Sequence, residues 1–447
     1  VAAVRASQLG AKVTLVEKEK LGGVCTNIGC IPTKALLRSA ELVEMLKESP
    51  KHGITIEKFT VSFAAAMARA NGIASTLSEH VNLLMKKHRV DVIYGFASLE
   101  DGESLSVKTR EGTTIRVRAR KIIVASGSSP FRIPIPGSES VGVVVSDDLF
   151  KLTSLPRRVV IAGAGAVGLE WAAIFRCFGS EVTVLEMMPQ ILPSEDEEVA
   201  RNMTRILEKQ GVGIHVSAKA SRIDDSLEGG KILTFETEEG LKKAEGDLIL
   251  LATGRKPNTA GLGLEKVGVI LDRGWIAVDD HMQTNISTIY AVGDVVGRFM
   301  LAHVAMQEGL VAAENAMDIN TKIDYNIVPR CVYTHPEVAS IGLSENEAKK
   351  ERPDVESATY LLRANGRALT LDRIDGMAKL VYEKRYGAIL GAQIISPEAS
   401  EMIHEMSVAK RLEATAEDLA SLIHAHPTLS EILREVSLRA VGRPLHG

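Results

Sequence analysis

The apolar residues of this chain gather in short runs that alternate with segments of helical periodicity. Val159–Glu186 is the clearest case, because an apolar strand there leads through a glycine-rich turn into a helix and a second apolar strand that ends in an acid. This order predicts a βαβ unit that binds a dinucleotide. Gly163, Gly165 and Gly168 would supply the tight turn, the close approach of backbone to pyrophosphate, and close helix–strand packing.

The second half of this unit is repeated at the start of the chain. Gln8–Glu17 reads QLGAKVTLVE, and Cys177–Glu186 reads CFGSEVTVLE. A glycine, a valine, a threonine and an acid match at one constant offset: Gly10, Val13, Thr14 and Glu17 against Gly179, Val182, Thr183 and Glu186. We therefore expect a second dinucleotide-binding unit whose glycine loop and first strand would lie before Val1, so that the sequence begins inside a helix.

Three further apolar runs fit strands that return beside a bound nucleotide. They are Lys121–Gly127, Asp247–Gly254 and Ser287–Asp294, and the last ends in a Gly-Asp turn. Asp294 would lie at a carboxyl edge, where ligands bind in such sheets, although a solvated turn aspartate is the alternative.

The pattern changes from about Tyr325, where no glycine fingerprint is present. Strands are expected in Arg330–Ile341, Ala378–Glu383 and Ala388–Ile395, and helices in Ser400–Arg411 and Ala416–His424. The predicted fold class is α/β, with two Rossmann-like dinucleotide-binding domains followed by an α+β C-terminal domain.

Charge and composition narrow the kind of partner. The net charge of −4 over 447 residues, with both signs scattered, gives no electrostatic reason to expect nucleic acid or an anionic membrane. The longest apolar runs are strand-sized and far short of the roughly 20 residues that span a bilayer. A small or protein-bound organic substrate fits better.

Only one close pair occurs among the four cysteines, Cys25 and Cys30 in GGVCTNIGCIPTK. Five residues of ideal helix rise about 7.5 Å, beyond the usual Cα separation of a disulfide, so a local distortion at Gly29 is expected if the two sulfurs are to bond. Pro32 suits the first turn of a helix through Lys34–Lys47. Helix N-terminal amides would favour the reactive thiolate.

Other interpretations of the cysteines stay open or are disfavoured. Cys25 and Cys30 could be buried thiols, whereas zinc is disfavoured because no second pair supplies ligands, and no metal is predicted. Cys177 and Cys331 lie within apolar patterns and are expected to be small core residues.

A run near the C-terminus, His424–Glu431 or HAHPTLSE, combines two imidazoles and a carboxylate. A histidine that titrates near neutrality suits the deprotonation of an attacking thiol, with a carboxylate to orient it. The alternative is a helix cap, because Thr428 followed by Glu431 resembles a capping box. At the other candidate site, Glu186 favours NAD, since a 2′-phosphate would meet a negative charge.

GGVCTNIGCIPTK, the two dinucleotide units, the VGD turn and HAHPTLSE together resemble the pyridine nucleotide–disulfide oxidoreductases, most closely the dihydrolipoamide dehydrogenases. The resemblance covers essentially the whole chain. It implies an FAD-binding domain at 1–148 that lacks its N-terminal strand and glycine loop, an NAD-binding domain at 149–272, a return to the FAD domain at 273–322, and a dimerisation domain at 323–447.

The resemblance also implies roles for individual residues. Cys25 would exchange with the substrate disulfide, Cys30 would contact the flavin as a thiolate, and His426 would be the acid/base with Glu431 as its partner. The residues expected to bind FAD are Glu17, Lys34, Gly95, Ser126, Gly127, Asp294 and the segment Met300, Leu301, Ala302 and His303. Those expected at NAD are Gly163, Gly165, Gly168, Glu170, Glu186 and Gly254, with Lys34 paired to Glu170.

The implied activity is the oxidation of protein-bound dihydrolipoamide by NAD through FAD. It would be carried out by a homodimer, because His426 would reach the disulfide of the other subunit, with lipoyl domains of a 2-oxo acid dehydrogenase or glycine cleavage complex as partners. The expected compartment is the cytoplasm, or the mitochondrial matrix in a eukaryote.

Two alternatives remain. Another disulfide reductase is disfavoured, since a mercuric reductase would add a C-terminal cysteine pair and a glutathione reductase would prefer arginines where Glu186 lies. An inactive, flavin-poor scaffold subunit is the other alternative, because a chain without the first glycine loop could lose affinity for FAD.

Overall fold

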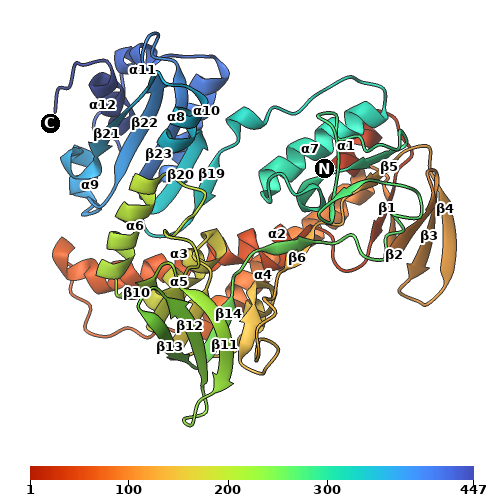
Figure 1. Cartoon of the computed structure of the whole chain (residues 1–447), viewed down its shortest axis with the longest axis horizontal. Coiled ribbons are helices and arrows are strands. Elements are labelled where there is room, and N and C mark those ends of the chain that lie inside the picture. Colours follow the sequence, from red (N-terminus) through yellow and green to blue (C-terminus); the bar gives the residue numbers. More distant parts are fainter. Residues whose placement is uncertain (447) are drawn as a thin grey trace. The chain divides into compact units, whose positions relative to one another are not determined.

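The computed structural model describes residues 1–446 and divides into two compact units (Figure 1). The first unit consists of Val1–Pro32, Ala68–Phe131 and Gly254–Asp324. The second consists of Thr33–Met67, Arg132–Thr253 and the chain from Tyr325 onward. Each unit therefore combines segments that are far apart in the sequence.

The first unit contains the repeated helix–strand segment. Helix α1 (Ala2–Gln8) leads into strand β1 (Thr14–Glu17), which pairs in parallel with β2 (Asp91–Asp101). Strands β3 (Ser104–Thr109) and β4 (Thr114–Arg118) extend this sheet in the order β1-β2-β3-β4. Helix α1 begins at Ala2, with Val1 as its N-cap.

Besides this sheet, the first unit contains three two-stranded pairs. Strand β5 (Ile122–Val124) is parallel to β18 (Ile289–Ala291), β6 (Ser128–Pro130) is antiparallel to β15 (Arg255–Pro257), and β16 (Leu271–Asp272) is antiparallel to β17 (Trp275–Ile276). The strands predicted in Lys121–Gly127 and Ser287–Asp294 are therefore neighbours, and their carboxyl ends meet at one edge.

Helices of the first unit include α2 (Gly23–Ile28), the 3₁₀ turn η3 (Gly293–Val296) and α7 (Ala302–Ala316). α7 buries Val304, Glu308, Val311 and Ala312, the spacing of one helix face. It packs against α1, where Arg5 forms an ion pair of 2.7 Å with Glu314. Helices α3 (Cys30–Glu48) and α4 (Phe63–Lys87) each begin in one unit and end in the other.

The second unit contains a five-stranded parallel sheet in the order β10-β9-β8-β14-β7. Its strands are β7 (Val143–Val145), β8 (Arg158–Ala162), β9 (Glu181–Leu185), β10 (Val212–His215) and β14 (Leu248–Leu251). Helix α5 (Ala166–Phe178) connects β8 to β9, and α6 (Glu197–Lys209) leads to β10. The predicted βαβ unit is confirmed.

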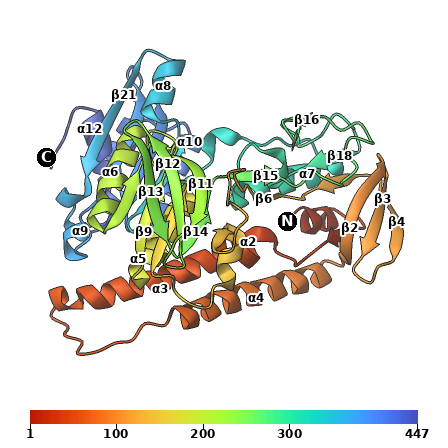
Figure 2. The same ribbon diagram turned by 60° about the horizontal axis from the view of Figure 1, so that its bottom comes forward.

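Burial explains the apolar runs of this sheet. Residues Gly168–Phe175 of α5 are buried without interruption, and all of them except Glu170 are apolar or glycine. Strand β14 is buried at every position, which is typical of a parallel strand covered on both faces. Strands β11 (Lys219–Asp225), β12 (Lys231–Thr237) and β13 (Gly240–Gly246) form a separate antiparallel sheet, drawn in green in Figure 2.

The C-terminal part of the second unit is an antiparallel sheet in the order β19-β20-β23-β22-β21. The strands are β19 (Arg330–Val332), β20 (Glu337–Gly342), β21 (Val355–Leu361), β22 (Met377–Glu383) and β23 (Ile389–Ser396). The helices are α8 (Glu345–Glu351), α9 (Gly366–Thr370), α10 (Ala399–Arg411), α11 (Ala416–Ser421) and α12 (Glu431–Ala440).

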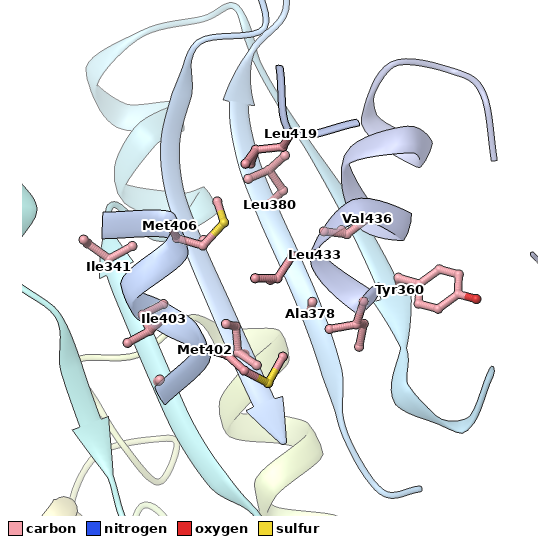
Figure 3. Close-up of a cluster of buried hydrophobic side chains, with 14 of the residues drawn as sticks. Ile341, Tyr360, Ala378, Leu380, Met402, Ile403, Met406, Leu419, Leu433 and Val436 are labelled. Atoms are coloured by element: carbon pink, nitrogen blue, oxygen red, sulfur yellow. The ribbon is translucent and has the colours of Figure 1, made fainter. Parts of the chain in front are cut away.

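One apolar core joins these helices to the C-terminal sheet. Ile403 and Met406 of α10, Leu433 and Val436 of α12, and Leu380 of β22 meet in it (Figure 3). The chain also contains four further short 3₁₀ helices: η1 (Ser49–His52), η2 (Ser146–Lys151), η4 (Tyr325–Ile327) and η5 (Leu362–Ala364). The predicted fold class is therefore confirmed, with α/β sheets followed by an α+β C-terminal region.

Two expected elements differ from the structure. Arg330–Ile341 is not one strand, because β19 ends at Val332 and Pro336, which has no amide hydrogen, precedes β20. The helix expected in Ala416–His424 ends at Ser421, since Leu422 is already extended. The sequence analysis predicted neither β21 nor α12.

None of the helices within residues 1–446 is long and apolar enough to cross a membrane.

Candidate active site

The two close cysteines lie on either side of a helix break. Cys25 is in α2, and Cys30 begins α3. Gly29 separates them with φ −135° and ψ −115°, and a Cβ at Gly29 would lie 2.9 Å from the Val24 carbonyl oxygen. Only glycine fits there without displacing backbone, so the distortion predicted at this position is present. Both cysteines are half-buried.

The other two cysteines are suited to packing. Burial raises the pKa of the Cys177 thiol to about 12 and that of the Cys331 thiol to about 12. A thiol with so high a pKa stays protonated near neutrality and is a poor nucleophile. Among residues 1–446, no group of three or more potential ligands could hold a metal ion.

Lys34 and Glu170 form an ion pair inside the second unit, as predicted. The Lys34 Nζ atom donates to both carboxylate oxygens of Glu170, at 2.9 and 2.8 Å. Glu170 is on α5 with its side chain only 7% exposed, and Lys34 is one turn beyond Cys30 on α3. A third residue completes the arrangement, because the Tyr333 backbone amide donates to Glu170 Oε1 at 3.0 Å.

The three glycines at the turn from β8 into the first turn of α5 have distinct geometries. A Cβ at Gly163, whose φ is +109°, would lie 2.3 Å from the Ala252 carbonyl oxygen. A Cβ at Gly168 would lie 1.9 Å from the Gly163 carbonyl oxygen. Gly165 is the N-cap of α5 and has open space within the described chain. Gly163 and Gly168 allow close packing, and Gly165 leaves the helix N-terminus open to a phosphate.

Glu186 follows β9, and backbone amides hold its carboxylate. Ala164 donates to Oε2 at 2.7 Å, and Met188 donates to Oε1 at 2.9 Å. The residue is 8% exposed. The acid therefore lies against the glycine-rich loop, as a group that binds the adenosine ribose of NAD should. Gly254, at φ +101°, lies three residues beyond β14, the strand that pairs with β8.

In the first unit, polar groups gather where β5 and β18 end. Asp294 in η3 accepts a hydrogen bond of 2.5 Å from the Ser128 hydroxyl, and Arg255 lies 3.6 Å from the same carboxylate. The buried Ser126 hydroxyl has no hydrogen-bond partner among the described residues. Gly127 takes φ +71°. An unsatisfied buried hydroxyl at this edge fits a polar ligand such as the FAD that the resemblance implies.

The remaining residues expected to bind FAD lie on or next to three different elements of the first unit. Glu17 ends β1, and its carboxylate accepts from the Glu19 amide at 2.7 Å. Gly95 lies inside β2, where a Cβ would come within 2.4 Å of the Lys108 carbonyl oxygen of β3. Close pairing of the strands is a sufficient reason for glycine at that position. Met300 and Leu301 precede α7, which begins at Ala302 and includes His303.

The two histidines of the HAHPTLSE run form different pairs within the second unit. His426 Nδ1 is 2.9 Å from Glu431 Oε1, and the His426 side chain is 78% exposed. Glu431 Oε2 accepts from the Thr428 amide at 2.8 Å, so half of the expected capping box is present. His424 is instead bound to Glu405 of α10 at 3.0 Å and is only 8% exposed.

Glu431 is held in its charged form. Burial acts to raise its pKa, but the Thr428 amide and the His426 side chain outweigh that effect and lower it. A carboxylate in this position fixes the imidazole by its Nδ1 atom and leaves the exposed Nε2 atom available for proton transfer. The arrangement is that of an acid/base pair.

Sequence reasoning missed Tyr333 and the amides that orient the carboxylates. Ser128 and Arg255 at Asp294 were also missed, although KIIVASGSSP and ATGRKP each continue directly from a predicted strand. A search of the residues just beyond each strand end could have found these two.

Together, the fold and these contacts define a class of protein: an α/β dinucleotide-binding oxidoreductase with paired cysteines. Residues 1–309 match the pyridine nucleotide-disulphide oxidoreductase family model, and residues 328–437 match the dimerisation domain of that family. The chain belongs to the pyridine nucleotide-disulphide oxidoreductase family.

Named relatives of the chain agree with this assignment. A dihydrolipoyl dehydrogenase of Bacillus subtilis is 38% identical and covers 100% of this chain and 97% of its own length. The mitochondrial dihydrolipoyl dehydrogenase of Pisum sativum is also 38% identical, over 100% of this chain and 90% of its own length. The crystal structure of LpdA from Mycobacterium tuberculosis superposes with a TM-score of 0.89 at 27% identity, covering 98% of this chain and 97% of that one.

Proposed function

We propose that the chain is a dihydrolipoyl dehydrogenase, which oxidises protein-bound dihydrolipoamide and reduces NAD through FAD and a Cys25–Cys30 disulfide. The observation that carries the proposal is the His426–Glu431 hydrogen bond of 2.9 Å, because thiol substrates need a base. The names of full-length relatives at 38% identity support the same substrate.

The proposed reaction begins with a proton transfer from a substrate thiol to His426 Nε2. The resulting thiolate attacks the Cys25 sulfur of the disulfide, so that a substrate–Cys25 bond forms and Cys30 leaves as a thiolate. The second substrate thiol then attacks the substrate sulfur of the mixed disulfide and gives its proton to the leaving Cys25 sulfur, which closes the substrate disulfide and leaves Cys25 as a thiol. Two electrons now reside in the Cys25–Cys30 dithiol.

FAD, when bound, supplies the two-electron transfer from this dithiol to NAD. The residues we assign to it are Ser126, Gly127 and Asp294 at one strand edge, with Glu17, Lys34, Gly95 and Met300–His303 assigned by resemblance alone. For NAD we assign Gly163, Gly165, Gly168, Glu170, Glu186 and Gly254. The carboxylate of Glu186 favours NAD over NADP and so argues against a glutathione reductase-like function.

We further propose a homodimer in which His426 of one subunit serves the disulfide of the other. The match of residues 328–437 to a dimerisation domain supports it. Lipoyl domains of a 2-oxo acid dehydrogenase or glycine cleavage complex are the proposed partners. We also propose the domain boundaries predicted from the sequence, at 148, 272 and 322. The proposed compartment is the cytoplasm, or the mitochondrial matrix in a eukaryote, in line with a relative named as mitochondrial.

The test is to purify the protein, record its flavin spectrum, and measure NAD reduction with dihydrolipoamide. The proposal predicts a yellow protein with activity that depends on dihydrolipoamide and prefers NAD to NADP. A yellow protein that instead reduces glutathione disulfide or mercuric ion would replace the substrate assignment. A colourless, inactive protein would support the scaffold alternative.

A further inference from the structure

Tyr333 contacts both members of the buried ion pair in the second unit. It follows β19 directly, and its amide donates to Glu170 Oε1 at 3.0 Å. Its ring lies beneath the Lys34 ammonium, with Nζ 4.3 Å from the ring centroid. One residue thereby holds the carboxylate through its backbone and the ammonium through its side chain.

The burial of the pair makes these contacts matter. The Glu170 side chain is 7% exposed and the Lys34 side chain is 31% exposed. A carboxylate this buried needs several donors to offset its lost hydration, and Lys34 and the Tyr333 amide provide them. The ammonium is partly open to solvent, and the aromatic face covers one of its sides. A cation–π contact is stronger where water is partly excluded.

The Tyr333 ring is suited to this role because it stays neutral. Burial raises the pKa of Tyr333 to about 12, although a hydrogen bond with the Ser400 side chain acts in the opposite direction. The phenol therefore keeps its proton near neutrality and cannot serve as a base there. Its contribution comes from the π face, which attracts the ammonium whether or not the hydroxyl is present.

We propose that Tyr333 is a positioning residue that fixes the Lys34 ammonium against Glu170 through its aromatic ring. The inference rests on the proposed function in one respect, the assignment of Lys34 and Glu170 to the cofactor site. Lys34 is one helical turn beyond Cys30 on α3, so a shift of its ammonium changes the charge close to the reactive thiols.

The first test measures how fast Lys34 reacts with an amine-acylating reagent in the oxidised holoenzyme, by peptide mass spectrometry. Tyr333→Leu removes the ring but keeps the backbone amide, whereas Tyr333→Phe keeps the ring and removes the hydroxyl. We expect Lys34 of Tyr333→Leu to be labelled roughly two- to tenfold faster than Lys34 of the wild-type protein. This range corresponds to the loss of a cation–π contact of about 0.5–1.4 kcal/mol, since 1.4 kcal/mol is a factor of ten. Tyr333→Phe should label at the wild-type rate.

The chain supplies two controls. Lys47 is on the same helix and donates to the Cys177 carbonyl oxygen at 3.0 Å, so its labelling should not change in either variant. Tyr386→Leu removes a ring that is 68% exposed in the same unit and stacks with Arg385 at 4.9 Å. Lys34 should label normally in that variant. Faster labelling of Lys34 and Lys47 together would indicate general loosening and would overturn the proposal.

A second readout is the division of the kinetic effect between kcat and KM. A positioning role predicts that Tyr333→Leu lowers kcat about threefold or more with KM for dihydrolipoamide little changed, and that Tyr333→Phe restores kcat. Wild-type labelling in Tyr333→Leu, or equal acceleration in Tyr333→Phe, would overturn the proposal. If Tyr333→Leu fails to fold, Tyr333→Met, whose longer and more flexible side chain adapts better to the space left by the ring, makes the same comparison.

Failure of the two hypotheses can be told apart. A wild-type protein without dihydrolipoamide-dependent NAD reduction contradicts the proposed function. The labelling comparison needs no turnover and judges the role of Tyr333 separately.

Discussion

At the scale of single residues, backbone amides orient three carboxylates of the candidate site. Glu431 accepts from the Thr428 amide, Glu170 from the Tyr333 amide, and Glu186 from the Ala164 and Met188 amides. One oxygen of Glu431 is thus fixed by the main chain, and the other faces His426. A pair held in this way needs little reorganisation when a proton moves.

Glu431→Gln keeps the shape of the side chain but removes the charge that stabilises protonated His426. We expect kcat for dihydrolipoamide oxidation to fall roughly 10²-fold, with a smaller change in KM, because general acid–base catalysis contributes about 10²–10⁴-fold. Glu405→Gln is the matched control, since it alters the other histidine–carboxylate pair, at His424. Equal losses in the two variants would contradict the assignment of Glu431.

Glu186→Arg should shift coenzyme preference from NAD toward NADP. The variant loses the charge that repels a 2′-phosphate, and it also loses two bonds to backbone amides of 2.7 and 2.9 Å. We therefore expect kcat/KM for NAD to fall about 10–100-fold, the equivalent of one or two charged hydrogen bonds. An unchanged NAD to NADP ratio in steady-state kinetics would mean that Glu186 does not face the ribose.

The sequence predicted the pairs that lie within one motif or that the resemblance supplied, such as His426 with Glu431 and Lys34 with Glu170. It could not predict Tyr333, because a backbone amide of a residue 163 positions away in the chain leaves no side-chain signal. The same distant contact bears on the end of β19 at Val332. The amide of the next residue, Tyr333, donates to Glu170 rather than to a neighbouring strand.

At the scale of elements, a buried lysine connects α6 and α8 to the C-terminal sheet. Lys379 on β22 has a side chain only 4% exposed, and its Nζ lies 2.9 Å from Asp196, 3.3 Å from Glu198 and 2.8 Å from Glu345. Asp196 is also the N-cap of α6. The sequence of β22 suggested nothing of this cluster, because its members are distant in sequence.

Lys379→Met should destabilise the protein by about 3–5 kcal/mol, because it leaves buried carboxylates without a counter-charge. Lys384→Met is the control, since Lys384 is 68% exposed and its pair with Glu356 is on the surface. Denaturant unfolding at neutral pH measures both. Equal, small losses in the two variants would contradict a structural role for the cluster.

The same cluster gives an acid dependence. Burial acts to raise the pKa of Glu345, but hydrogen bonds from Lys349 and Lys379 lower it from 4.5 to about 2. A carboxyl group with a lowered pKa stabilises the fold above its unfolded value, and that contribution is lost as the pH falls from about 4.5 toward 2. The deficit of Lys379→Met should therefore shrink over this window, as the unpaired carboxylates take up protons.

At the scale of the whole molecule, the internal repeat explains most of what could be predicted. The repeated segments are Gln8–Glu17 and Cys177–Glu186. In each of them the end of a helix is followed by a parallel strand. The C-terminal region was predicted only in part: neither β21 nor α12 was expected, although both contribute side chains to the shared core.

A shared active site predicts complementation between two inactive variants. Cys25→Ser and His426→Gln should each be inactive as homodimers, while co-expressed mixtures form heterodimers with one complete site. About a quarter of wild-type activity should return if subunits pair at random in a twofold dimer. No recovery, in mixtures verified to contain heterodimers, would mean that His426 does not serve the partner's disulfide.

The most direct test of the central claim is anaerobic reduction of the flavin-containing protein with dihydrolipoamide, followed by absorption spectroscopy. Wild-type protein should develop a long-wavelength band from a Cys30 thiolate beside the flavin, and addition of NAD should remove the band as NADH appears. Cys30→Ser should bind flavin but lack the band. An unchanged band in Cys30→Ser, or no band in the wild-type protein, would contradict the Cys25–Cys30 redox pair.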